Sequence, residues 1–382
     1  MTIDLADHQS CTGCGVCAYK CPKDAISLER DRAGFIYPRV DSTKCVQCGI
    51  CNKYCHVNNL TKNSRLSACF GWHSNPRIRE ESSSGGLFTA LAQTVLSEGG
   101  VVYGHVIDYS TLYTHCIRAE NEEQLSPMRQ SKYVESNITN VFDSINEDLS
   151  DRLVLFCGTP CQCAAIKKVY GDNKNLFLIS FLCYGVGAPN FFRDHYRFVS
   201  KNKKIKEIRM RDKFFGWHDD TVRIKYFKNK DYLAHYSVDA YYYCYISLGL
   251  YKRDCCYSCQ YTDNHLSDIT IGDYWNIVKT SYYDDNKGVS LIIANSEKGK
   301  ELLSLTEDVK LHSIDISEAE YAFFKCIDPN SETVQWKING KKQFLDSCKK
   351  RGFEFTARKY MKNTSLRKIK VFIKFLLRKT KK

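Results

Sequence analysis

Eight of the twenty cysteines fall into two runs that share the spacing C-x2-C-x2-C-x3-C. In this pattern, three thiolates of one run bind one [4Fe–4S] cubane and the fourth cysteine binds the other cubane. The crossing assigns Cys11, Cys14, Cys17 and Cys55 to one cluster, and Cys45, Cys48, Cys51 and Cys21 to the second. Glycines inside the runs (Gly13, Gly15 and Gly49) leave room for backbone that crowds the sulfurs.

Two other interpretations of these cysteines compete with this one. Zinc sites usually take their ligands as two separated pairs, whereas each run here places four thiols within eleven residues. Clusters with a purely structural role would show the same cysteine spacing. In that case, removal of iron would unfold this module but leave any activity of the rest of the chain intact. The two-cluster ferredoxin module is favoured. Pro22 follows the first run, whereas His56 occupies the matching place after Cys55, a departure expected to affect the turn rather than ligation.

Four further cysteines suggest a third cluster in the body of the chain. Cys161 and Cys183 each follow a predicted buried strand, and α/β folds place their sites at such strand ends. Cys256 and Cys259 form a C-x2-C pair, a moderate signal for metal or redox chemistry. Together they supply enough thiolates for a cubane, although each one alone would more often be a core thiol. The isolated cysteines are interpreted as core or surface thiols: Cys69, Cys116, Cys163, Cys244, Cys326 and Cys348.

Apolar patterns predict the elements that position these thiols. A polar stretch at 58–67 indicates a linker. The run Ser82-Ser83-Ser84-Gly85-Gly86 precedes helical spacing at 87–96, so the serines are expected as N-caps, and the helix N-terminus as a phosphate site or simply a capped end. Strands are expected at 101–107, 153–156, 176–182 and 268–275, with a helix at 162–170.

Residues 1 to 330 resemble the family of coenzyme F420 hydrogenase/dehydrogenase β subunits, which includes the β subunit of a formate dehydrogenase. The resemblance rests on Ser82 to Phe88, Ser131 to Val134, Gly158 to Gln162, Cys183 to Val186, Gly216-Trp217, Cys256 to Cys259 and Asp268 to Asp273. It implies FAD and a [4Fe–4S] cluster in the body, with Cys161, Cys183, Cys256 and Cys259 as ligands and Cys157 and Cys255 as substitutes. In the best-known members the flavin exchanges hydride with the deazaflavin coenzyme F420. Tyr184 stands where the family usually has histidine.

The resemblance also suggests flavin contacts. Ser82, Ser83, Ser84, Gly85 and Gly86 would suit the flavin pyrophosphate, and Gly158 and Thr159 belong to a second cofactor-binding motif. Lys132 would neutralise phosphate or stabilise the reduced flavin anion, the alternative being a solvated lysine. Asp273 would orient substrate or a ribose, or is only a turn residue. A flavin also fits the chemistry, because clusters carry single electrons while hydride carries two. No hydrolase pattern stands out, and the catalytic residues stay unknown.

The excess positive charge lies at one end. The net charge is +13, and residues 349–382 hold fourteen Lys or Arg against one acid, so the rest of the chain is balanced. This distribution argues against a body that binds nucleic acid. Residues 366–378 alternate apolar and basic side chains at helical spacing, which suits an anionic membrane surface. A helix that docks its apolar face on the body is the alternative.

These observations predict a mixed α/β protein of three parts: a two-cluster ferredoxin domain at 1–60, a flavin and iron–sulfur domain at 61–330, and a basic extension at 331–382. No apolar run is long enough to span a bilayer and no export leader is evident, so a cytoplasmic location is expected, with peripheral membrane contact through the tail.

The expected function is that of an iron–sulfur flavoprotein oxidoreductase that exchanges hydride with coenzyme F420 or another organic substrate. Ferredoxin, coenzyme F420 or NAD(P)H would be its redox partner, and cell-surface polysaccharide synthesis its setting. The alternative is a non-catalytic electron-transfer subunit that docks on a hydrogenase or dehydrogenase.

Overall fold

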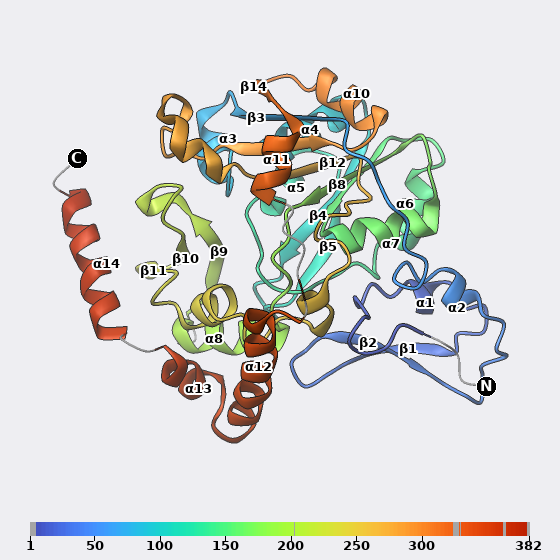
Figure 1. The fold of residues 1–382 in the computed structure, drawn as a ribbon, viewed down its shortest axis with the longest axis horizontal. Helices are drawn as coiled ribbons and strands as arrows, with labels where there is room; N and C mark the ends of the chain where they lie inside the picture. The colour runs from blue at the N-terminus through green and yellow to red at the C-terminus, as the bar shows by residue number, and fades with distance from the viewer. Residues whose placement is uncertain (1–4, 202, 324–327, 329, 362–363, 380–382) are drawn as a thin grey trace.

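A computed structural model describes residues 5–201, 203–323, 328, 330–361 and 364–379 (Figure 1). Cys326, expected as an isolated thiol, lies outside the described residues. The chain begins with a small module, drawn in blue, that contains the antiparallel hairpin of β1 (Ile26–Arg30) and β2 (Ile36–Val40). Two short helices, α1 (Val16–Tyr19) and α2 (Ile50–Lys53), each contain the third cysteine of a run. The other cysteines of the two runs lie in the loops that flank these helices.

Within the described residues, nine strands form one mixed sheet in the order β14-β3-β13-β12-β8-β7-β4-β5-β6. Its centre is parallel, because β4, β7, β8 and β12 run in the same direction. The expected strands of the α/β body are confirmed as β4 (Val101–Ile107), β7 (Val154–Gly158), β8 (Leu176–Phe181) and β12 (Ile269–Asp273). The others are β3 (Ser67–His73), β5 (Thr114–Ala119), β6 (Ser136–Asn137), β13 (Ser290–Ala294) and β14 (Val309–Ile314).

Helices cover both faces of this sheet because strand side chains alternate between faces. Val101 and Val154 pack in one core with Phe142 of α6 and Ile166 of α7, whereas Val102 faces the core on the other side. That second core contains residues of α4 and α10. The helices of the body are α3 (Pro76–Glu81), α4 (Leu87–Ser97), α5 (Glu122–Leu125), α6 (Phe142–Asp148), α7 (Pro160–Tyr170), α10 (Glu297–Leu305) and α11 (Ile316–Phe323). The predicted α/β class is therefore confirmed.

A second, smaller sheet has the order β11-β10-β9 and stands beside the large one (Figure 1). Its aromatic core also receives Phe344 and Phe353 from two C-terminal helices, so the segment predicted as an extension from residue 331 packs into the body. The elements are α8 (Pro189–Ser200), β9 (Ile205–Asp212), β10 (Thr221–Tyr226), β11 (Tyr232–His235), α9 (Ala240–Tyr242), α12 (Glu332–Arg351) and α13 (Phe353–Tyr360).

The last helix, α14 (Thr364–Lys379), runs along the outer side of the small sheet and ends the described chain (Figure 1). Neither this helix nor any other in the described residues is long and apolar enough to cross a bilayer.

Candidate iron–sulfur centres

The first predicted ligand set comes together from two loops of the N-terminal module. Burial, together with the nearby thiols of Cys11 and Cys55, raises the pKa of the Cys14 thiol to about 12. Burial also raises the pKa of the Cys17 thiol, and the nearby thiols of Cys14, Cys11 and Cys55 raise it further. The thiols that the crossed assignment groups together therefore lie close to one another. Gly13 has φ 73°, and a Cβ there would lie 2.6 Å from a guanidinium nitrogen of Arg253.

The second predicted set lines a separate cavity of the module. Cys21, Cys45, Cys48 and Cys51 all line a cavity of about 20 Å³. Burial raises the pKa of Cys51, and the thiols of Cys48 and Cys21 contribute in the same direction. Cys21 thus lies with the cysteines of the second run, and Cys55 lies with those of the first. The exchange of the last cysteine between the two runs is therefore present in the fold.

The third predicted set converges from three elements of the body. Cys161, Cys183, Cys256 and Cys259 line one cavity of about 80 Å³. Cys161 is the second residue of α7, Cys183 follows β8, and the other two belong to the turn around 254–259. Burial raises the pKa of Cys161, and the thiols of Cys183 and Cys259 raise it further. Cys14 of the first set lines the same cavity, so the first and third sets are neighbours.

Of the two substitutes considered for the third set, the structure places one at the cavity. Cys255 lines it, and a hydrogen bond from this thiol lowers the pKa of Cys256. Cys157 is buried at the end of β7. Burial raises the pKa of its thiol, and the positive charge of Lys132 partly opposes this increase. Within the described residues, no group of three or more His, Cys, Asp or Glu side chains could hold a single metal ion. Four thiols around a cavity instead suit a cubane, which presents one iron to each thiolate.

Arg253 joins the N-terminal module to the body. Its side chain is 1% exposed and donates to the backbone oxygens of Cys11 and Ile36, both at 2.7 Å. It also pairs with the buried carboxylate of Glu135, which in turn accepts from the Ile36 amide at 3.0 Å. The guanidinium lies over the Tyr37 ring, 4.1 Å from its centroid. These contacts fix the first cysteine set against the third.

The predicted flavin contacts at residues 82–86 are engaged within the chain. Helix α4 begins after Gly86, which has φ 93°, and no side chain caps it, so the prediction of a serine N-cap is wrong. The Ser82 hydroxyl donates to the Ile78 oxygen at 2.7 Å, and that of Ser84 to the Val289 oxygen at 2.9 Å. The hydroxyl of Ser83 accepts from the Ser131 amide, while the Gly85 amide donates to Ser290. These side chains do not fit a flavin pyrophosphate in this structure.

Lys132, expected near phosphate or flavin, also makes its hydrogen bonds within the chain. Its ammonium donates to the backbone oxygens of Pro127, Met128 and Arg129 at 2.6–3.1 Å. Burial lowers the pKa of Lys132 to about 7. All three protons of the ammonium group are thus committed to carbonyls at the end of a short helical turn.

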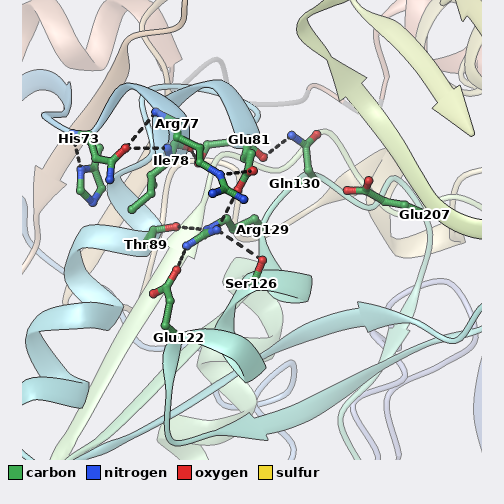
Figure 2. A network of polar contacts seen from close by, with 12 residues as sticks. His73, Arg77, Ile78, Glu81, Thr89, Glu122, Ser126, Arg129, Gln130 and Glu207 are labelled. Carbon is green, nitrogen blue, oxygen red and sulfur yellow. Dashed lines mark hydrogen bonds and ion pairs between the residues drawn. The ribbon is translucent and has the colours of Figure 1, made fainter. Parts of the chain in front are cut away.

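The neighbouring Arg129 is also neutralised, as Figure 2 shows. Its guanidinium lies between α3, α4 and α5, where it bonds Thr89 at 3.1 Å, Glu81 at 3.1 Å and the carboxylate of Glu122. Gln130 donates to the backbone oxygen of Glu81. This network ties the serine–glycine segment to α5 and leaves little positive charge for an added phosphate.

The remaining predicted site residues have clear places. Thr159 caps α7, and its hydroxyl lies 3.1 Å from the Cys161 sulfur; Gly158 ends β7 just before it. Asp273 binds the Trp217 indole nitrogen at 2.7 Å and Arg211 at 2.8 Å, so its role here is structural. Tyr184 is half-exposed and lines the cavity of the third cysteine set.

Comparisons with known proteins match both parts of the chain that contain the cysteine sets. Residues 10–59 match the 4Fe-4S dicluster domain, and residues 151–319 match the C terminus of the beta subunit of coenzyme F420 hydrogenase/dehydrogenase. The fold and its cysteine sets therefore define an iron–sulfur electron-transfer protein. More particularly, the chain joins a 4Fe-4S dicluster domain to the C-terminal domain of the coenzyme F420 hydrogenase/dehydrogenase beta subunits, and the expected family is confirmed.

Individual relatives cover the chain to different extents. It is 21% identical over 329 residues to a subunit of the F(420)H(2) dehydrogenase of Methanosarcina mazei, in an alignment that covers 80% of this chain and 91% of that protein. The methylamine utilization ferredoxin-type protein MauM of Methylobacillus flagellatus is 41% identical in an alignment of 61 positions that covers 13% of this chain and 26% of that protein. A chain of the F420-reducing [NiFe] hydrogenase complex from Methanosarcina barkeri aligns with a TM-score of 0.48 and 14% identity, covering 77% of this chain and 95% of that one.

Proposed function

We propose that this protein is an oxidoreductase in which three [4Fe–4S] clusters relay electrons between a redox partner and a substrate site in the body. The observation that carries the proposal is the shared cavity, where Cys14 of the N-terminal module faces the four body cysteines. Two clusters would be held by the crossed N-terminal sets and a third by Cys161, Cys183, Cys256 and Cys259. The partner would be a ferredoxin, coenzyme F420 or NAD(P)H.

The two-electron half of the reaction is proposed from the family resemblance. FAD, when bound, would supply the conversion between hydride and single electrons. Because the Lys132 ammonium and the hydroxyls of Ser82 and Ser84 are already engaged, its phosphates would be bound by other groups, such as the uncapped amides at the start of α4. The substrate would be a coenzyme F420-like or other organic compound, and cell-surface polysaccharide synthesis would be a fitting setting.

Anaerobic purification tests the cluster assignment. The intact protein should contain about twelve iron atoms per chain, four for each cubane. Cys161→Ser should reduce the content to about eight. Cys163→Ser is the matched control, because this thiol lies in the same helix and donates to the Ile179 oxygen at 3.4 Å. Equal iron contents in the wild type and Cys161→Ser would refute the third cluster.

A second candidate is a non-catalytic subunit that only passes electrons to a larger enzyme. It is favoured by the relative in Methanosarcina mazei, which is named as a dehydrogenase subunit and is matched over most of its length. The two candidates differ in turnover. An enzyme should reduce a soluble acceptor from NADPH, reduced coenzyme F420 or reduced ferredoxin by itself, whereas a relay subunit should take up electrons without turnover.

We further propose that α14 holds the protein at an anionic membrane surface. Three of its apolar side chains are exposed, namely Leu366, Ile369 and Ile373, and they lie at helical spacing. The opposite side contacts the body through Arg367, which donates to the Tyr243 hydroxyl at 2.6 Å. The described apolar face is thus turned outward rather than docked on the body, and a basic amphipathic helix suits acidic lipid.

Vesicle sedimentation tests the attachment. The wild type should sediment with phosphatidylglycerol vesicles and not with phosphatidylcholine vesicles, and Ile369→Glu with Ile373→Glu should abolish this. Leu305→Glu changes an equally exposed leucine on α10 and serves as the control. Equal sedimentation of the double variant and the control would refute the membrane role.

A further inference from the structure

His56 occupies the place where the first cysteine run has Pro22, and the structure shows what it contacts. Its side chain is buried within the protein. One ring nitrogen, Nε2, lies 3.1 Å from the hydroxyl of Thr12, next to Cys11. The other, Nδ1, contacts the hydroxyl of Tyr261, which lies 205 positions further along the chain. The residue that departs from the usual pattern thus links the N-terminal module to the body.

One arrangement of protons satisfies the three contacts among Thr12, His56 and Tyr261. The Thr12 hydroxyl donates to Nε2, Nδ1 donates to the Tyr261 oxygen, and the Tyr261 hydroxyl donates to the His56 backbone oxygen at 3.2 Å. The arrangement needs one ring nitrogen of His56 to accept and the other to donate, as a neutral imidazole does. A proline at position 56 could make neither ring contact.

Tyr261 lies between the first and third cysteine sets. It packs in a small core with Cys161 and Cys259, and its amide donates to the Cys259 sulfur at 3.4 Å. It lines the same cavity as Cys14. A single phenol side chain therefore touches the surroundings of both proposed clusters.

We propose that Tyr261, positioned by His56, is the electron-transfer contact between the N-terminal cluster of Cys11, Cys14, Cys17 and Cys55 and the cluster of the body. The inference rests on the proposed function, which supplies both clusters. One electron leaves the reduced cluster and enters the oxidised one, in either direction. No bond breaks, the tyrosine is not itself oxidised, and its proton stays on the hydroxyl. The hydrogen bonds hold the ring in contact with both sites.

The test compares variants of the fully loaded, anaerobic protein. After photoreduction, freeze-quench EPR follows the arrival of the electron at the body cluster, whose signal is the one that Cys161→Ser removes. Tyr261→Phe deletes only the hydroxyl and should slow this arrival several-fold, and His56→Pro should do the same. Tyr257→Phe is the matched control, because this buried tyrosine of the same turn donates to the Gly249 oxygen instead. It should transfer electrons at the wild-type rate.

Iron content and the reduction potential of each cluster are measured in every variant, so a lost or altered cluster is recognised directly. Unchanged transfer in Tyr261→Phe with all clusters present would overturn the inference. Equal slowing in Tyr257→Phe would overturn it as well, because the effect would then belong to the turn as a whole. A wild type that lacks the body signal would instead refute the proposed function on which the inference depends.

Discussion

Raising the pH should loosen the C-terminal helix α13 before it affects the central sheet. The cause is His195 of α8, whose side chain is 2% exposed and lies between two carboxylates. Its Nε2 lies 3.1 Å from Asp239, and its Nδ1 contacts Glu354 of α13, which is the single acid in residues 349–382. Burial opposes the charge on His195, but Asp239 and then Glu354 outweigh it and raise the pKa to about 9.

The size of the effect follows from this shift. The folded pKa lies above the ordinary value of 6.5, so the stabilisation is complete below pH 6.5 and is lost as the pH rises through about 9. Between pH 7 and pH 9.5 the whole site should lose about 2 kcal/mol. Asp239 accounts for the larger part, and its contact survives when α13 detaches. The contribution of Glu354 to the docking of α13 is therefore about 1 kcal/mol, or about a fivefold change in the opening equilibrium.

Amide hydrogen exchange of the intact holoprotein measures that equilibrium helix by helix. Protection factors, which are corrected for the intrinsic pH dependence of exchange, should fall about fivefold in α13 between pH 7 and pH 9.5. Those of α4, which lies on the large sheet away from this site, should stay constant. His195→Gln should give weaker protection of α13 that no longer depends on pH. If α13 keeps its protection in the wild type, or if α4 loses protection in parallel, the charged histidine does not hold the helix.

Three further outcomes are expected. Glu135→Gln leaves Arg253 without its buried partner, which should cost about 3–5 kcal/mol of folding stability and speed the proteolytic release of residues 1–60. Glu29→Gln is the control, because it breaks only an exposed ion pair and should leave the release rate unchanged. Equal release rates in the two variants would contradict the docking role of Arg253. Phe344→Ala should destabilise the protein by about 3–5 kcal/mol, and an unchanged thermal midpoint would show that α12 adds nothing to the core. Anaerobic chelation of iron should remove amide protection from α1 and α2 but not from α4, and protection that persists in α1 would show that the module folds without metal.

Short-range patterns in the sequence predict much of the site. The spacing of the two cysteine runs is enough to predict the crossed grouping, because a thiol must reach a cubane corner through a fixed length of backbone. Apolar runs bounded by glycine and proline predict the strands that precede Cys161 and Cys183, since buried parallel strands are nearly continuous in hydrophobicity.

Other features depend on contacts that no local pattern shows. Ser84 looks like a phosphate donor in the sequence, but the Val289 oxygen, 205 positions further along the chain, already accepts its proton. The protons of Lys132 are likewise accepted by carbonyls three to five residues before it. The contact of His56 with Tyr261 joins positions 205 residues apart, and its local hint is the departure from the proline of the first run. The long helix after residue 331 has few buried side chains, so its docking through Phe344 could not be predicted from the pattern.

The exchange of Cys21 and Cys55 between the two halves of the N-terminal module has a consequence for biogenesis. In the proposed ligand assignment, each half supplies one thiol to the cluster of the other half, so neither half would bind its cluster alone. Both loops would then have to be folded together before either cluster is complete, and a half-filled module would leave thiols of both loops open to oxidation.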